Sequence, residues 1–185
     1  MDKNLLRKEL KEKRNLISQK DKGNFDTLIS EKIISLKEFK VAKNILLFSP
    51  LNNEFNTEIL FNKAKIMGKN IFYPRCTDKN GNMEFFKISY FEDFEKGSYG
   101  ILEPKEFLPK YIKCKNSVCI IPALSVDKNY YRIGYGKGYY DRFLKDFTGV
   151  KICPCYDLLL SESLPHNNFD VMVDIIITEK DIMRR

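Results

Sequence analysis

The chain has no tryptophan, a single histidine and no Cys-x-x-Cys pair among its five cysteines. Structural zinc sites are usually built from four cysteine or histidine ligands, with closely spaced pairs along the sequence. The closest cysteines, Cys153 and Cys155, enclose a proline in a segment that reads as a strand, and no histidine cluster is present to complete a metal shell. We therefore expect no zinc site and interpret the cysteines as buried, reduced thiols. His166 lies in a polar loop, and we expect it at the surface.

No apolar run is long enough to span a membrane or to form the hydrophobic part of a signal peptide. The first residues, MDKNLLRKELKEKR, are charged from the second position onwards. The chain also lacks internal repeats, low-complexity segments and linkers. Its 185 residues are the length of about one ordinary domain. We therefore expect a single domain over residues 1–185, located in the cytoplasm and without a membrane partner.

The charge is unbalanced towards the basic side, with 32 lysines and arginines against 25 aspartates and glutamates and a net charge of +7. This excess indicates an anionic partner, without distinguishing a nucleic acid from a nucleotide or a polycarboxylate. One alternative is a basic nucleic-acid-binding module, because the first predicted helix is rich in lysine. However, Glu9 and Glu12 interrupt that helix, and no RNA- or DNA-binding motif is present. We therefore expect no nucleic-acid partner.

Hydrophobic periodicity predicts two helices at the start of the chain. The first runs from Lys3 to about Gln19, and the second from Phe25 to Lys37, after a break at Gly23. The first helix also carries a basic stripe, in which cations recur at helical spacing. On charge pattern alone, such a stripe is interpreted as a solvated face. Its members are Lys3, Arg7, Lys11 and Arg14.

After these helices, short apolar runs alternate with helical segments. Residues 44–50, 57–68 and 70–75 read as a βαβ unit, whose strands lie in a parallel sheet buried on both faces. Residues 83–88 and the loop after them read as an insertion that leaves the sheet edge. The pattern predicts an α/β fold: a single three-layer α/β/α domain with a mainly parallel central sheet. The other expected elements are strands at 118–126, 150–156 and 173–180 and a helix at 137–147.

The segment RIGYGKGYYD, from Arg132 to Asp141, has the clearest chemical pattern. Its alternating glycines, Gly134, Gly136 and Gly138, allow backbone N–H groups to approach an anion closely. The helix that follows adds unpaired donors and about half a positive charge, and the arginine and lysine of the segment add full charges. The pattern is neither a Walker A loop nor a Rossmann fingerprint. It predicts an anion site or, as the alternative, a tight connection between a strand and a helix.

Carboxylates in and near this segment indicate that a metal ion binds together with the anion. Asp141 lies one turn inside the predicted helix, where it can hold Mg²⁺ against phosphates bound at the helix start. Asp174 and Asp127 stand at the ends of predicted strands, where α/β sheets build their sites. Each of these two is equally well interpreted as a capping or turn residue. We therefore predict a magnesium-phosphate site at Asp141, with a second carboxylate as its partner.

Further motifs follow one another along nearly the whole chain. They are Lys-x-x-x-Arg at Lys3 and Arg7, SPLNNEFNT at 49–57, YPR at 73–75, YGILEP at 99–104, PALSVD at 122–127 and VDIIITE at 173–179. Together with the glycine segment, which is the most specific of them, they make the chain resemble the 5-formyltetrahydrofolate cyclo-ligases, also called methenyltetrahydrofolate synthetases. The resemblance implies a NagB/RpiA/CoA-transferase-like α/β/α fold.

The resemblance also implies an activity, that of EC 6.3.3.2. Such an enzyme couples ATP hydrolysis to the closure of 5-formyltetrahydrofolate into 5,10-methenyltetrahydrofolate, with release of ADP and phosphate. ATP phosphorylates the formyl oxygen, the second folate nitrogen attacks the activated carbon, and phosphate leaves. The expected co-substrate is therefore ATP, the expected metal is Mg²⁺, and the expected partners are a reduced folate and a nucleotide. We expect the chain to be a monomer.

Roles for individual residues follow from the matching motifs. The resemblance implies that Lys137 and Arg132 act in catalysis, with Lys137 stabilising the transferred phosphoryl group, and that Asp141 and Asp174 hold Mg²⁺. The residues expected to bind ATP are Lys3, Arg7, Arg132, Ile133, Gly134, Tyr135, Gly136, Lys137, Gly138, Tyr139 and Tyr140. The residues expected to bind folate are Leu51, Glu54, Asn56, Tyr135, Gly136, Lys137, Gly138 and Tyr139, with Glu54 accepting pterin N–H groups.

Three positions depart from the pattern of the family. Tyr130 stands where many relatives have glycine, Phe169 where many have histidine, and Asn56 where an acidic residue is common. These differences bear on the shape of the glycine loop and on folate recognition. A second alternative is a folate-binding protein that has lost catalysis; the presence of all the predicted phosphate and metal residues argues against it.

Overall fold

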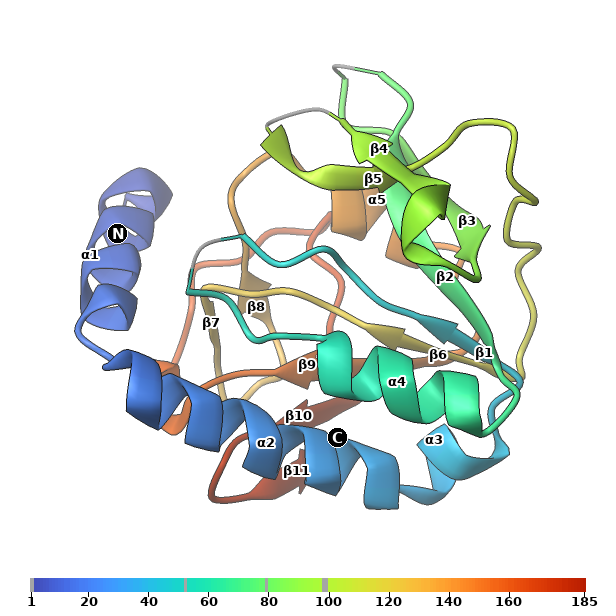
Figure 1. Ribbon diagram of the computed structural model, residues 1–185. Helices are drawn as coiled ribbons and strands as arrows, with labels where there is room; N and C mark the ends of the chain where they lie inside the picture. Colours follow the sequence, from blue (N-terminus) through green and yellow to red (C-terminus); the bar gives the residue numbers. More distant parts are fainter. Residues whose placement is uncertain (1, 52, 79, 98–99) are drawn as a thin grey trace.

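The computed structural model of the protein describes residues 2–51, 53–78, 80–97 and 100–185. At its centre lies a seven-stranded sheet (Figure 1). The five inner strands run parallel, and the two edge strands pair antiparallel with their neighbours. The predicted mainly parallel sheet is therefore confirmed. In spatial order the strands are β11 (Ile182–Arg184), β10 (Ile175–Ile177), β9 (Val150–Pro154), β6 (Ser117–Ile120), β1 (Asn44–Leu46), β2 (Asn70–Cys76) and β3 (Met83–Ile88).

Helices flank both faces of this sheet (Figure 1). On one face, α2 (Gln19–Ser35) and α4 (Glu58–Ile66) lie side by side, and the short α3 (Lys37–Val41) follows α2. The other face carries α5 (Tyr139–Leu144), whereas α1 (Lys3–Asn15) stands apart from the sheet. The predicted α/β fold is confirmed. Within the described residues, none of the helices has the length and apolar character that a membrane crossing needs.

Aromatic side chains on β2 and on the edge strand β3 show how the two faces are covered. Successive side chains of a strand point to opposite faces of the sheet. Tyr73, which pairs with Phe86, contacts Phe61 of α4, with 6.2 Å between the ring centroids. Phe85, on the opposite face of the same strand as Phe86, packs against Phe143 of α5 with its centroid at 4.6 Å. The sheet is therefore buried between α4 and α5.

The predicted βαβ unit is present as β1, α4 and β2, but the interpretation of residues 83–88 was wrong. They form β3 and pair along their whole length with β2 instead of leaving the sheet. The reason is that side chains on both sides of this segment are apolar, with Phe85 and Phe86 both buried, so it fits between two covering layers. The segment that does leave the sheet is the hairpin of β4 (Phe94–Lys96) and β5 (Leu102–Pro104).

The boundary between the first two helices also differs from the prediction. The second helix begins at Gln19, not Phe25, because the Ser18 side chain caps it by accepting a hydrogen bond from the Asp21 N–H group at 3.1 Å. Gly23 is therefore an exposed residue inside α2 and does not break it. Ile29 and Ile33 of α2 are fully buried, and burial of this face outweighs the cost of about 1 kcal/mol that a helical glycine carries.

Gly23→Ala is expected to stabilise the protein by about 0.5–1 kcal/mol, because alanine loses less backbone entropy in a helix. An added Cβ would meet nothing within 4 Å at this position. Gly68, just after α4, is the matched control: it has equally open space but a φ of +67°. Gly68→Ala is expected to destabilise the fold by about 1 kcal/mol or more. Urea unfolding of both variants measures the two effects, and a stability loss at Gly23 would contradict the expectation.

Three of the cysteines belong to the hydrophobic core. Cys119, Cys153 and Cys155 are buried on the central strands or directly after them. Burial raises the pKa of the Cys153 thiol to about 12, so that it stays protonated near neutral pH. The prediction of buried, reduced thiols is therefore confirmed for these three cysteines. Cys76 and Cys114 are only partly buried.

Candidate active site

A cleft of about 1050 Å³ lies at the carboxyl ends of the parallel strands. Phe48 follows β1, Cys76 ends β2 and Pro122 follows β6, and all three line it. The chain places β2 on one side of β1 and β6 on the other, and such a switch point is where open α/β sheets bind ligands. The volume is at the upper end of the roughly 300–1,000 Å³ of common ligand pockets. Every predicted site residue lines this cleft except Asn56 and Asp174.

The glycine segment forms a loop between β8 (Arg132–Ile133), which pairs with β7 (Ser125–Val126), and α5. Gly136 and Gly138 have φ angles of +97° and +73°, which other residues adopt only with strain. A Cβ at Gly136 would also lie 3.0 Å from the guanidinium carbon of Arg7. Gly134 has neither restriction. Two of the three glycines are therefore required by a tight loop that packs against α1.

The basic stripe of α1 faces this loop and is not a solvated face. Arg7 donates from Nε to the Gly134 carbonyl at 2.9 Å, and the Lys11 ammonium lies 5.0 Å from the centre of the Tyr135 ring. Lys3 donates to the Asp170 carboxylate at 2.9 Å. The structure therefore brings Lys3 and Arg7 to the cleft, as the resemblance implied, although they are more than 120 residues before the loop in sequence.

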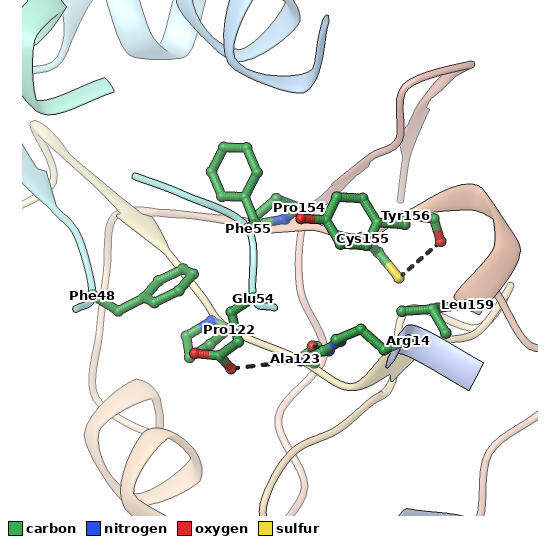
Figure 2. A pocket seen from close by; sticks show the side chains of 10 residues that line it. All are labelled: Arg14, Phe48, Glu54, Phe55, Pro122, Ala123, Pro154, Cys155, Tyr156 and Leu159. Atoms are coloured by element: carbon green, nitrogen blue, oxygen red, sulfur yellow. Dashed lines mark hydrogen bonds and ion pairs between the residues drawn. The ribbon is translucent and has the colours of Figure 1, made fainter. Parts of the chain in front are cut away.

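Glu54 is a buried carboxylate in the wall of the cleft, with 5% of its surface exposed. Its Oε2 accepts a hydrogen bond from the Leu51 N–H group at 2.7 Å. Its Oε1 has no hydrogen-bond partner among the described residues and lies 3.9 Å from Nη1 of Arg14 (Figure 2). Burial raises the pKa of the Glu54 carboxyl above its ordinary value, against the opposing effects of the Leu51 N–H, the Tyr135 hydroxyl and the Arg14 guanidinium.

Arg132 is tied into an ion pair beneath the loop. It donates from Nη2 to Oδ1 of Asp141 at 2.9 Å and from Nη1 to the Val171 carbonyl at 2.8 Å, and only 4% of its side chain is exposed. The Val171 N–H group donates to the same Asp141 oxygen at 3.1 Å. The other oxygen, Oδ2, has no hydrogen bond within the described part of the chain. Arg132 therefore supports Asp141, and its charge is already paired.

Two polar groups next to these residues are unpaired within the described ranges. The Lys137 side chain is exposed at the cleft, and its ammonium has no hydrogen bond or ion pair with the described residues. The Tyr140 hydroxyl is buried without a hydrogen-bond partner, and burial raises its pKa well above the ordinary value. An exposed cation and an unsatisfied hydroxyl in one cleft favour a polar ligand there.

Two predicted residues are not brought to the cleft. Asn56 is exposed and caps the start of α4, accepting a hydrogen bond from the Glu58 N–H group at 2.9 Å. Asp174 lies at the amino end of β10 and accepts hydrogen bonds from Lys151 and Arg185. The structure therefore gives these residues structural contacts and does not join Asp174 to Asp141 in the cleft.

The contacts of Asp127 decide between its two interpretations, a site residue or a turn residue. It is buried and accepts backbone hydrogen bonds from Asn129, Tyr131 and Leu164 at 2.8 to 3.0 Å. These contacts are those of a turn residue, which holds the connection between β7 and β8. Across the described residues, no group of three or more histidine, cysteine, aspartate or glutamate side chains could hold a metal ion.

Comparisons with known proteins show what the whole chain is similar to. The sequence profile of the 5-formyltetrahydrofolate cyclo-ligase family matches residues 1–179. The chain belongs to this family. A 5-formyltetrahydrofolate cyclo-ligase of Mycoplasma pneumoniae is 30% identical over 184 residues, which cover 97% of this chain and 100% of the relative. Proteins of the family cyclise 5-formyltetrahydrofolate to 5,10-methenyltetrahydrofolate with ATP as co-substrate, so the predicted activity and enzyme class are confirmed.

Solved structures show the same fold. A 5,10-methenyltetrahydrofolate synthetase of Aquifex aeolicus is similar over 100% of this chain and 93% of its own, with a TM-score of 0.87 and 29% sequence identity. A 5,10-methenyltetrahydrofolate synthetase of Mycoplasma pneumoniae is similar over 97% and 99%, with a TM-score of 0.76 and 28% identity.

The cyclo-ligase motifs gave no role to several residues in or next to the cleft. Arg14 belongs to the predicted basic stripe, but no role was assigned to it, because spacing cannot show which cation of a stripe becomes buried. Asp170 was missed as the partner of Lys3. An apolar wall formed by Met83, Ile101 and Leu102 was also missed, since these residues come from the edge strand and from the hairpin that leaves the sheet.

The structure shows what surrounds two of the residues that depart from the cyclo-ligase pattern, Tyr130 and Phe169. Tyr130 has a φ of +67°, which explains why glycine is common there in the family. Its side chain packs against the core, and this contact offsets a backbone strain of about 1–3 kcal/mol. Phe169 lines the cleft and is 85% exposed, so its exchange for histidine changes the surface of the cleft and not the core.

Proposed function

We propose that the cleft is the active site, and that ATP and 5-formyltetrahydrofolate bind in it side by side with the glycine segment between them. This proposal rests on one observation: the kinds of side chain that line a single cleft. It is lined by cations suited to phosphates and by the buried carboxylate of Glu54, which is suited to pterin N–H groups. Its volume of about 1050 Å³ leaves room for two ligands.

The nucleotide occupies the end of the cleft between α1 and the glycine loop. Lys3 and Arg7 supply positive charge there, and the loop approaches closely because its glycines carry no side chains. Lys137 is on the same loop, and its ammonium group has no hydrogen bond or ion pair with the residues that the structure describes. A lysine in this position acts as a mobile point charge on the transferred phosphoryl group.

The folate occupies the end that contains Glu54. The free oxygen Oε1 of Glu54 accepts a hydrogen bond from the pterin, which removes an unsatisfied buried acceptor. Leu51 and Tyr139 line the same wall, and Met83 and Leu102 offer apolar surface to the ring system. Tyr139 donates from its hydroxyl to the Asp78 carbonyl at 3.2 Å, which orients its ring.

In the reaction, the γ-phosphoryl group of ATP passes to the formyl oxygen and ADP is released. The second folate nitrogen then forms a bond to the formyl carbon and loses its proton, while the carbon–oxygen bond breaks and phosphate leaves. Phosphoryl transfer needs positioning and neutralisation of charge more than covalent chemistry from the protein. The cations of α1 and of the loop supply that neutralisation.

The residues present also fit a magnesium ion. Mg²⁺ usually keeps several waters and is held by one or two carboxylates together with substrate phosphates, so it does not need a cluster of protein ligands. Asp141 lines the cleft, and its oxygen Oδ2 has no hydrogen bond within the described ranges. Asp141 would therefore hold the ion, which when bound neutralises phosphate charge. The predicted contribution of Asp174 stays a prediction, since its contacts are with Lys151 and Arg185.

The test is a spectroscopic assay of the purified chain with 5-formyltetrahydrofolate, ATP and Mg²⁺. The expected result is the ultraviolet absorption of the methenyl product, which requires all three additions. Folate binding without turnover would favour the alternative of a protein that has lost catalysis. Oligonucleotide binding that weakens steeply with salt, without turnover, would favour the nucleic-acid-binding module.

We further propose that the enzyme acts as a monomer in the cytoplasm. What supports this proposal is that the residues predicted to bind the nucleotide and the folate, apart from Asn56, line one cleft of the chain. Sedimentation of the purified protein measures the mass, and a dimer at assay concentrations would contradict this expectation.

A further inference from the structure

Arg14 is the most deeply buried cation of α1, with 6% of its side chain exposed. It lies on the same helical face as Lys3 and Arg7, three turns beyond the first of them. In contrast to these two residues, it does not line the large cleft. It lines a small cavity behind the cleft, together with Glu54 and Ala123 (Figure 2). A buried arginine requires partners, and these partners indicate what it does.

The guanidinium of Arg14 joins three separate segments. Nη1 donates to the Tyr135 hydroxyl of the glycine loop at 3.1 Å and lies 3.9 Å from Oε1 of Glu54. Nη2 donates to the carbonyl oxygen of Ala123, in the segment after β6. Arg14 therefore contacts both Glu54 and the glycine loop, the two walls between which we have placed the folate.

Glu54 is a buried carboxylate that forms its ion pair with Arg14. The cavity behind it has about 10 Å³, room for roughly one water molecule at most, so bulk water cannot solvate the carboxylate from that side. Burial disfavours the charged form and raises the pKa of Glu54. The groups that face Glu54 and influence its charge are Arg14 from α1, Lys22 from α2, Tyr135 from the glycine loop and Tyr140 from α5.

We propose that Arg14 is a positioning residue for folate: it keeps the Glu54 carboxylate ionised and holds it in place beside Tyr135, so that folate binding depends on Arg14 much more than ATP binding does. This inference rests on the proposed function of the cleft. Arg14 itself touches neither substrate, because it lies behind the wall that Glu54 forms.

A purely structural role for Arg14 has a different consequence. If the residue only anchored α1, its loss would displace the whole helix, including Lys3 and Arg7. The KM values for ATP and for folate would then rise together. The two roles are therefore separated by comparing the two KM values and by the pH dependence of folate binding.

The first variant is Arg14→Met, which keeps the length of the side chain and removes its charge. We expect the KM for 5-formyltetrahydrofolate to rise about tenfold or more, as for the loss of a charge-assisted contact, while the KM for ATP changes less than about threefold. The acidic limb of the pH profile of kcat/KM for folate is expected to move to higher pH, because the carboxylate loses a neighbouring cation. Equal rises of both KM values, or an unmoved acidic limb, overturn the proposal.

Glu54→Gln is the matched control, because it removes the titrating group and leaves Arg14 in place. It is expected to abolish the acidic limb. In this background, Arg14→Met should raise the folate KM much less than in the wild type, whereas additive effects of the two changes overturn the proposal. If the wild type forms no methenyl product, the proposed function fails; if it does and the two residues act independently, only the role of Arg14 fails.

Arg14→Lys decides the question if the methionine variant does not fold. Lysine keeps the charge but cannot donate to Tyr135 and Ala123 in the same geometry. A selective rise of the folate KM, with the acidic limb close to that of the wild type, supports the proposal. A rise of both KM values by the same factor, or no rise, overturns it.

Discussion

Lys137→Met is expected to lower kcat by about two to three orders of magnitude, the effect usual for removing one group that stabilises charge in a transition state. Lys137 is exposed, and its ammonium has no hydrogen bond or ion pair with any described residue, so the substitution opens no cavity and leaves no buried partner unpaired. The melting temperature should therefore stay close to that of the wild type. The KM for ATP should change by only a few fold, because the charge acts on the phosphoryl group in transfer and less on the bound ground state.

Lys63→Met is the matched control. Lys63 is an exposed lysine on α4 and does not line the cleft, so the same change of charge there should leave kcat unaltered. Steady-state kinetics of the two variants, with thermal unfolding beside them, measure the difference. A kcat for Lys137→Met within a few fold of the control would show that the lysine has no part in phosphoryl transfer.

Much of the site could be predicted because its chemistry depends on local sequence. The glycine segment, the pair Lys3 and Arg7, and Glu54 all came from short motifs, and the structure places them in one cleft. What the sequence could not show is which cation is exposed and which is buried. Lys3 and Arg14 are eleven residues apart on one helical face, yet Lys3 is paired at the cleft and Arg14 lies behind it. That difference arises from packing against Glu54 and Tyr135, which are distant in sequence.

The parallel strands were predicted correctly because the hydrophobic pattern there is strong. The errors concern single elements, namely the start of α2 and the strand at residues 83–88. The parallel strands are short apolar runs, and burial on both faces follows from that composition. Gly23 was interpreted as a break, but the cap at Ser18 and the buried face of α2 decide that helix. Residues 83–88 were assigned to an insertion, but they form an antiparallel edge strand, which needs only a short turn after β2.

The second large effect is expected at Asp141, the carboxylate proposed to hold Mg²⁺. Asp141→Asn is expected to raise the Mg²⁺ concentration for half-maximal activity by about tenfold or more, corresponding to a loss of at least about 1.4 kcal/mol in metal binding. Asparagine keeps the size of the side chain and an oxygen that can accept from the Val171 N–H group. Activity should recover in part at high Mg²⁺, because substrate phosphates supply the remaining ligands.

A structural effect of the same substitution must be separated from the metal effect. Arg132 is buried and loses its counter-charge in Asp141→Asn, so a loss of stability of about 1–3 kcal/mol is expected as well. Stability alone would lower activity at every Mg²⁺ concentration and would leave the midpoint of the titration unchanged. Asp174→Asn is the comparison: its partners, Lys151 and Arg185, make a loss of stability without a shift of the midpoint the expected result. A shift as large as that of Asp141→Asn would make Asp174 a metal ligand, as the motif implied, and an unmoved midpoint in both variants would mean that neither carboxylate holds the ion.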